Sequence, residues 1–367
     1  MQEQALRKVL LIQAIEETDR RGEVLPLPER LEATRTVIGS NPPAIETQAE
    51  APLSSTTEWF LTRRADMLLD SLRARSPGID HLLEVAGGSI SLNRYMLVVA
   101  FVLGAILSLL DGARGGINIF APPLVALIAW NLLAYVLMLG RARAVKVSTT
   151  DARAPAAATT ASSTASAAGG ARASWFGRFY ARWVRRRIDV LLRHSTHFNA
   201  PLAPSLRRFT DDWWDIAQPW FFARARRLLH VSAVFVALGL VSAYYLRAFI
   251  LRSAAGWEGG GAIEPETALI LLTLLYGPAS LISGIPIPDA DGIAKLRWSA
   301  PSLPGVGEPA IWIHLIALTA VLYIILPRLI LALVSTLSLW RLSRQLVLPS
   351  GVGGYARTLF AAARYGT

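Results

Sequence analysis

The chain has 367 residues, 53% of them hydrophobic and 17% charged, with a mean hydropathy of +0.40. This composition is more apolar than that of an average soluble domain and disfavours a purely water-soluble fold. The absence of cysteine excludes disulfides, thiolate metal sites and cysteine nucleophiles. The formal net charge of +11 must lie outside the apolar segments, so the charges report on membrane topology.

Residues 1–92 predict a helical region on the cytoplasmic side of a membrane. The apolar run near residue 10 leads into Glu16 and Glu17 rather than a small-residue cleavage site, so it does not resemble a secretory signal. Helical spacing of apolar residues predicts one helix over residues 6–15 and a second over residues 61–72. The Pro-rich stretch 42–52 between them is predicted to be a linker.

Residues 93–140 predict a transmembrane hairpin. Sixteen residues from Tyr95 to Leu110 and twenty-four from Ile117 to Gly140 carry no charge, and a Gly-rich turn joins these two runs. Asn131 is a strongly polar side chain in the middle of the second run. We expect it to form an interhelical hydrogen bond; the alternative is a role in a permeation path.

The Ala/Ser/Thr-rich residues 141–173 predict a flexible linker, and residues 174–227 predict basic amphipathic helices in the cytoplasm. Aromatic residues recur at every fourth position from residue 175, among many arginines. We expect this helix to lie on anionic headgroups; docking on the N-terminal region is the alternative, and nucleic-acid binding is not favoured. The residues expected at the lipid surface are Trp175, Arg178, Phe179, Arg182, Trp183, Arg185, Arg186 and Arg187.

Residues 228–340 predict a second membrane unit. Its first span covers residues 228–246, and its last apolar block covers residues 310–339. Between them, block 268–288 is interrupted by Gly277-Pro278 and is expected to be a broken, re-entrant segment. The prediction is therefore an all-α, polytopic helical membrane protein with four full spans plus one re-entrant segment; five spans are the alternative.

The charge distribution predicts the orientation in the membrane. Sixteen basic but only five acidic residues lie between Arg141 and Arg227, and the basic tail, residues 341–367, carries no acidic residue. Because loops rich in basic residues stay inside the cell, we expect the central segment, the tail and the N-terminus in the cytoplasm. The expected location is the bacterial inner (cytoplasmic) membrane, crossed several times.

Recognisable catalytic motifs are absent, so we expect no catalytic, cofactor-binding or metal-binding residues. Nucleotide-binding loops, nucleophile elbows and zinc-protease patterns do not occur in the sequence. His194 and His197 have no carboxylate partner at helical spacing, and residues 289–292 are expected to form a polar turn rather than a calcium loop.

Two groups of residues stand above this background as candidate functional positions. At Pro327-Arg328 a proline frees a backbone carbonyl that the arginine can occupy, although extension of Arg328 to inner-leaflet phosphates is the plainer expectation. Polar and aromatic residues also flank the third span, where membrane anchoring is the plainer expectation. Together with Asn131, Gly277 and Pro278, the candidates are Arg328, Pro327, Arg227, His230, Arg247, Trp257 and Glu258.

Short motifs over most of the chain carry a resemblance. They are Leu-Ile-Gln-Ala-Ile-Glu-Glu-Thr-Asp (11–19) and the stretches 29–35, 218–220, 227–230, 245–247, 256–258, 277–279 and 326–329. Together they resemble an uncharacterised bacterial inner-membrane family, a domain of unknown function, whose genes often neighbour one for a cytoplasmic GTPase-like protein. The family continues Trp-Glu-Ser-Thr where this chain has Trp257-Glu258-Gly259-Gly260. The resemblance implies a GTPase-like partner and no catalytic residue.

The expected function is a non-enzymatic inner-membrane receptor or scaffold for a cytoplasmic partner, because about half of the chain reads as cytosolic and no catalytic set is found. The alternative is a channel or transporter that uses Gly277-Pro278 and Arg328. An enzyme acting on lipids is third. Other expected partners are the anionic inner leaflet and a second copy of the chain.

Overall fold

The computed structural model describes residues 3–40, 55–87, 90–111, 116–151, 175–194, 200–251, 254–257, 263–298, 308–344 and 350–365. The chain divides into two compact units. Unit 1 is built from Met1–Ile90, Arg172–Ala225 and Ser335–Thr367, and unit 2 from Ser91–Ala171 and Arg226–Val334. The predicted all-α, polytopic helical fold is confirmed.

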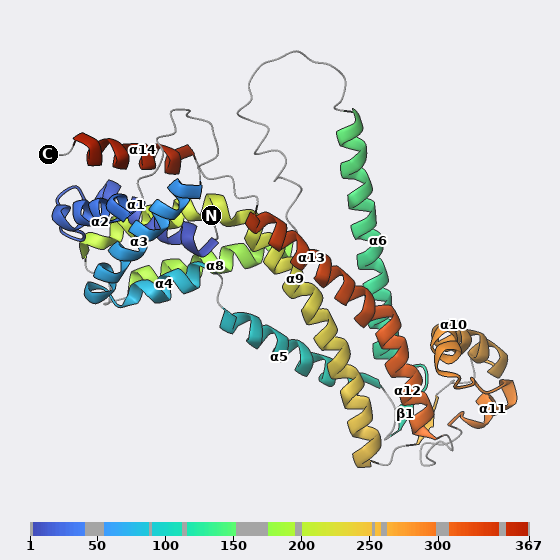
Figure 1. The fold of residues 1–367 in the computed structure, drawn as a ribbon. Helices are drawn as coiled ribbons and strands as arrows, with labels where there is room; N and C mark the ends of the chain where they lie inside the picture. The colour runs from blue at the N-terminus through green and yellow to red at the C-terminus, as the bar shows by residue number, and fades with distance from the viewer. Residues whose placement is uncertain are drawn as a thin grey trace. The chain divides into compact units, whose positions relative to one another are not determined.

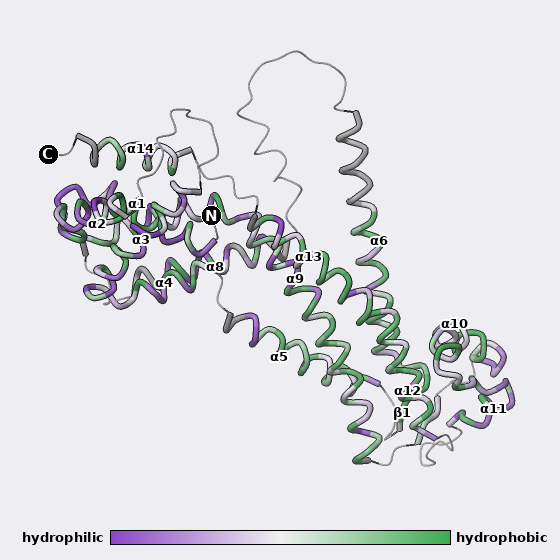
Figure 2. The backbone as a smooth tube through the Cα atoms, viewed as in Figure 1, coloured by the Kyte–Doolittle hydropathy of each residue, from purple (hydrophilic) through white to green (hydrophobic). Residues whose placement is uncertain are grey.

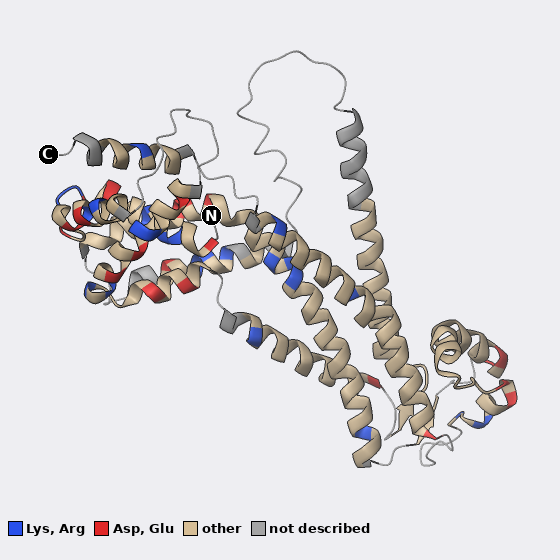
Figure 3. Ribbon diagram, in the orientation of Figure 1, with Lys and Arg blue, Asp and Glu red and all other residues tan. Residues whose placement is uncertain are grey.

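Unit 1 is a helical assembly that contains many Lys, Arg, Asp and Glu residues (Figure 3). The helical spacing predicted for residues 6–15 is confirmed, since Leu6, Val9, Leu10 and Ile15 are all buried where α1 packs on α3. The elements of unit 1 are α1 (Glu3–Thr18), α2 (Leu27–Ser40), α3 (Ser55–Arg75), α4 (Gly78–Ala86), α8 (Trp175–His194), η2 (Ala200–Leu202), the first part of α9 (Ala203–Leu251) and α14 (Ser350–Tyr365) (Figure 1).

A buried polar network ties the C-terminal helix α14 to α1 and α3. Arg64 of α3 donates to Glu16 Oε1 at 2.6 Å and to the Tyr355 hydroxyl at 2.8 Å, and Tyr355 donates to Glu16 Oε2 at 2.5 Å. Burial opposes the charge on Arg64, but Tyr355 and Glu16 outweigh it and raise the pKa of the guanidinium. The tail predicted for residues 341–367 therefore contains a helix that is part of unit 1.

Unit 2 contains long apolar helices (Figure 2). Among the described residues, five helices are long and apolar enough to cross a membrane: Asn93–Asp111, Pro122–Gly140, Ala203–Ile250, Pro265–Ser283 and Pro309–Leu342. The elements are α5 (Ile90–Leu107), η1 (Ser108–Asp111), β1 (Ile117–Asn118), α6 (Pro122–Asp151), the rest of α9, β2 (Ala255–Gly256), α10 (Pro265–Ser283), α11 (Ala290–Lys295), α12 (Pro309–Ala320), the π-helical turn η3 (Val321–Ile325) and the first part of α13 (Leu326–Arg344), whose end from Ser335 belongs to unit 1.

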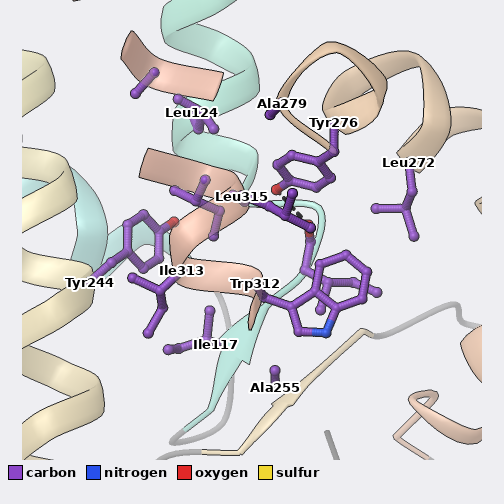
Figure 4. Packing of buried hydrophobic residues seen from close by; sticks show 14 of the residues in the cluster. Ile117, Leu124, Tyr244, Ala255, Leu272, Tyr276, Ala279, Trp312, Ile313 and Leu315 are labelled. Carbon is purple, nitrogen blue, oxygen red and sulfur yellow. Dashed lines mark hydrogen bonds between the residues drawn. The ribbon is translucent and has the colours of Figure 1, made fainter. Parts of the chain in front are cut away.

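The core of unit 2 lies where α6, α9, α10 and α12 meet. Figure 4 shows Tyr276 pointing from α10 toward Leu315 of α12, and its hydroxyl donates to the Ile119 carbonyl at 2.7 Å. On the other side of α12, Tyr244 of α9 lies near Ile313. Tyr276 and Tyr244 are fully buried, so their rings fix the packing of α10 and α9 around α12.

Three connections of unit 2 are hydrogen-bonded to one another. β1, which follows α5, pairs in parallel with β2, which follows α9. Trp257, just after β2, pairs with the segment after α11: Trp257 N donates to Leu296 O at 3.1 Å, and Trp298 N donates to Trp257 O at 3.0 Å. The chain therefore enters and leaves the α10 region at the same place.

Several predicted boundaries are wrong. The second span begins at Pro122 rather than Ile117, because residues 117–118 form β1. The linker predicted from residue 141 starts too early, since helix-forming residues extend α6 to Asp151; residues 152–174 lie outside the described part, as does the linker predicted at residues 42–52.

The break predicted at Gly277-Pro278 is also wrong. Helix α10 runs through Pro278 without interruption and ends at Ser283, where Gly284 adopts a left-handed conformation with φ of 70°. A proline removes one backbone donor, which a helix in a membrane protein tolerates when neighbouring groups compensate.

The polar turn predicted at residues 289–292 is confirmed, because the Asp289 side chain accepts a hydrogen bond from Gly292 N at 2.9 Å.

Candidate functional site

Helices α6, α9 and α13 bring three predicted candidates together in unit 2: Asn131, His230 and Arg328. All three are buried. Arg328 Nε donates to Asn131 Oδ1 at 2.6 Å, and Arg328 Nη1 donates to His230 Nδ1 at 3.1 Å. The interhelical hydrogen bond expected for Asn131 is confirmed, and its partner is the arginine that the sequence also singled out.

The backbone before Arg328 explains how this side chain enters the cluster. Pro327 has no N–H, so it cannot bond the Tyr323 carbonyl that an α-helix would pair with it. The helix instead contains the π-helical turn η3, in which Leu326 N donates to Val321 O. The Tyr323 carbonyl accepts a long hydrogen bond, 3.4 Å, from the Tyr135 hydroxyl. The freed carbonyl is therefore used by a tyrosine, and not by the arginine, which was one of the alternatives that the sequence left open.

The side chain of Arg328 is buried among the helices of unit 2, and nothing in the structure tests the expected extension to inner-leaflet phosphates. Its exposed fraction is 5%, and its guanidinium carbon lies 5.2 Å from the centre of the Tyr135 ring. Asn131 and His230 provide two hydrogen-bond acceptors, and Tyr135 provides an aromatic face. Together they hold the side chain of Arg328 among the helices.

Sequence reasoning missed Tyr135. It lies four residues after Asn131 on α6, so both side chains occupy one helical face. The four-residue spacing indicates that Tyr135 and Asn131 lie on the same side of α6. A tyrosine in an apolar run, however, does not by itself indicate a polar cluster.

A second polar cluster lies at the connection between α5 and β1, and it contains the candidate Arg247. Arg247 donates to the carbonyls of Ser108 at 2.7 Å and Gly116 at 3.0 Å. Asp111 accepts from the Tyr244 hydroxyl at 3.0 Å and from Asn118 N at 3.1 Å. These bonds satisfy backbone groups of Ser108, Gly116 and Asn118 at the two described ends of this connection.

The candidate Trp257 is part of the core of unit 2 rather than a residue at the membrane interface. It is fully buried, and its indole N–H donates to Ile293 O at 2.9 Å. Arg297 lies over its ring at 5.3 Å. Glu258 lies outside the described residues. Gly277 and Pro278 lie on α10, and Arg227 is a half-buried residue one turn before His230.

Helix α8 packs on unit 1 through one face, and the residues predicted for the lipid surface lie mostly outside this face. Tyr180, Val184 and Ile188 are buried, and α8 packs against α4, so the alternative of docking on the N-terminal region is confirmed. Phe179 is 53% exposed and Trp183 is half-buried. The side chain of Trp175 lies outside the described part. The remaining positions, Arg178, Arg182, Arg185, Arg186 and Arg187, are exposed, with Arg185 paired to Asp211 at 3.0 Å and Arg187 over Trp183 at 5.0 Å.

Within the described ranges, no group of three or more histidine and acidic side chains is placed to hold a metal ion. The side chain of His194 and the whole of His197 lie outside these ranges. Comparison with models of known protein families, with curated proteins and with solved structures finds no match to this chain.

Proposed function

We propose that this protein is a receptor or scaffold of the bacterial inner membrane, without enzymatic activity of its own, that binds a cytoplasmic partner through unit 1. The observation that carries the proposal is the construction of unit 1. Three chain segments, separated by apolar helices, join in one packed helical body, and the Glu16–Arg64–Tyr355 network fastens the last segment to the first. A chain that assembles such a body beside the membrane presents it to a soluble protein.

The topology we propose has four full spans, with α10 not crossing. The segments before and after α10 are paired through Trp257 and Trp298, which supports a common side for both ends of this helix. Residues 284–289 are not helical, and irregular backbone is not stable across lipid. In Figure 1, α10 is seen almost end-on, whereas α6 and α12 run along the page. The excess of basic residues in the central segment supports a cytoplasmic N-terminus and unit 1.

A groove on α2 is the surface we assign to the partner. It encloses about 480 Å³ and is lined by Leu27, Pro28, Leu31, Glu32, Arg35 and Thr36. Leu27 is 62% exposed, so the groove combines an exposed apolar side chain with the charged side chains of Glu32 and Arg35. The resemblance noted above supports a GTPase-like protein as this partner.

Two further partners belong to the proposal. The basic outer face of α8 suits the anionic inner leaflet, and a second copy of the chain is another candidate. Nucleic acid is not part of the proposal.

The test uses the full chain in nanodiscs and a purified GTPase-like protein from the same bacterium, the partner class that the resemblance implies. We expect binding that depends on the bound guanine nucleotide and that Leu27→Asp weakens about tenfold. Arg21→Glu is the matched control, because the side chain of Arg21 is 87% exposed and lies outside the groove. Absence of binding by the unaltered protein in every nucleotide state contradicts the proposed partner.

The second candidate function is a channel or transporter. The buried Asn131–His230–Arg328 cluster favours it, since polar groups inside membrane helices often mark solute pathways. The uninterrupted α10 removes the broken helix on which this alternative also relied. Selective flux through liposomes that is lost on Arg328→Gln would support a channel and count against the scaffold.

A further inference from the structure

Arg328 is a permanent positive charge inside a membrane helix. A guanidinium stays protonated in proteins, and burying it is costly unless an opposite charge is near. In the part of the chain that the structure describes, no ion pair includes Arg328. Its partners, Asn131, His230 and Tyr135, offer hydrogen bonds and an aromatic face but no negative charge. The cluster is therefore solvated but not neutralised.

His230 supplies a second unmet requirement. Because its Nδ1 accepts the hydrogen bond from Arg328, the proton of the neutral ring is on Nε2. This Nε2 atom is buried and has no hydrogen-bond partner within the described residues, although His230 is only 2% exposed. A buried donor without an acceptor is costly, so it also favours a bound acceptor.

The position of the cluster along α9 indicates which acceptor is within reach. Arg226 and Arg227 precede His230 by one helical turn, and rows of basic residues at the end of a span lie at the level of the lipid headgroups. The guanidinium has five N–H groups, and its hydrogen-bond partners are Asn131, His230 and Tyr135, so N–H groups remain. In the topology proposed above, the charge of Arg328 lies close to the lipid phosphates.

We propose that the Asn131–His230–Arg328 cluster binds a phosphate-type anion. Its source is the phosphodiester of an anionic lipid or a free phosphate ion. The negative charge neutralises Arg328, and the oxygens of a phosphate accept from the remaining guanidinium N–H groups. The Nε2–H of His230 lies on the ring edge opposite Arg328, so its acceptor is a separate group. This site is independent of the partner surface on α2.

The experiment measures anion binding to the purified full chain in a neutral detergent. Phosphatidylglycerol, phosphatidylcholine and inorganic phosphate are titrated separately, with native mass spectrometry for the lipids and thermal unfolding for phosphate. We expect a preference of about tenfold for one anionic probe over phosphatidylcholine, lost in Arg328→Gln. Arg94→Gln is the matched control, since it removes an exposed arginine of α5 in the same unit and should leave the preference unchanged.

The outcomes separate the two sources. A response to phosphatidylglycerol alone assigns the site to a lipid headgroup, and a response to inorganic phosphate alone assigns it to a free ion. If Arg328→Gln does not fold, Arg328→Lys replaces it; this variant keeps the charge but loses the forked donor, and a weakened preference is expected. The proposal is overturned if the unaltered protein treats all three probes alike, or if the Arg328 variant that folds keeps the full preference.

Discussion

At the scale of single residues, Asp19 organises the loop between α1 and α2. Its carboxylate accepts hydrogen bonds from the backbone N–H groups of Glu23 at 2.9 Å and of Val24 and Leu25 at 3.0 Å. Arg30 adds an ion pair at 2.7 Å. Burial works against the charged carboxylate, but the three N–H groups and Arg30 outweigh it and hold the pKa of Asp19 below its usual value. The charged form is therefore the one that stabilises the fold.

The stability of unit 1 should consequently depend on pH through Asp19. A carboxyl with a lowered folded pKa stabilises above its unfolded pKa, about 3.9, and loses this contribution as the pH falls through the folded value. We expect Asp19→Asn to cost about 2 kcal/mol at neutral pH in thermal unfolding, and the difference from the unaltered protein to vanish in acid. Glu23→Gln is the control, because its side chain is half exposed. An equal loss at both pH values would contradict the role of the charge.

At the scale of helices, two glycines set the contact between α5 and α9. A Cβ atom at Gly104 would overlap the Val236 carbonyl oxygen, and one at Gly239 would overlap the Phe101 carbonyl oxygen. The two backbones therefore touch directly, as in membrane helix pairs built on small residues. Ala100, one turn before Gly104, is buried in the same stretch of α5.

Gly104→Ala should separate α5 from α9. The backbone oxygen cannot move aside as a side chain can, so we expect a loss of about 1–3 kcal/mol in the thermal stability of the purified protein. Gly140→Ala is the same substitution on α6, where no atom lies within 4 Å of the added Cβ, and it should be neutral or slightly stabilising. Equal effects of the two substitutions would show that the α5–α9 contact is looser than described.

At the scale of the whole molecule, the pairing of the connections supports the number of crossings that we propose. β1 pairs with β2, and Trp257 pairs with the segment that follows α11. Three connections of unit 2 thus meet, and the segment that contains α10 and α11 begins and ends among them. The proposed topology, with an even number of crossings, agrees with unit 1 drawing its segments from both termini and from the centre of the chain.

Single cysteines can test this topology directly, because the chain has none of its own. With an impermeant maleimide applied to intact spheroplasts, we expect labelling of Glu266→Cys, in the first turn of α10, and of Asp291→Cys, on α11 after it; both positions are exposed. Arg21→Cys in unit 1 should react only after the membrane is opened. Labelling of Glu266→Cys and Asp291→Cys from opposite sides would mean that α10 crosses.

Much of the candidate site could be predicted because intramembrane polar residues are rare. Asn131 and Arg328 attracted notice as polar groups in apolar runs, and His230 as a polar residue at the start of a span. Their mutual contact could not be predicted, since it depends on the rotation of three helices about their own axes. Tyr135 was missed for the same reason: its role is defined by Arg328 and by the carbonyl that Pro327 leaves free.

The sequence by itself determined the class of the protein, the apolar helices and the basic segments, because hydrophobic length and charge are local properties that act without any partner. Only the tertiary structure decided which face of α8 is buried, since Tyr180 and Phe179 are both apolar and α4 selects between them. It also decided that α10 continues through Pro278, because a missing hydrogen bond breaks a helix only where the surrounding packing permits it. The inward placement of Arg328 has the same origin: acceptors on two other helices hold the charge.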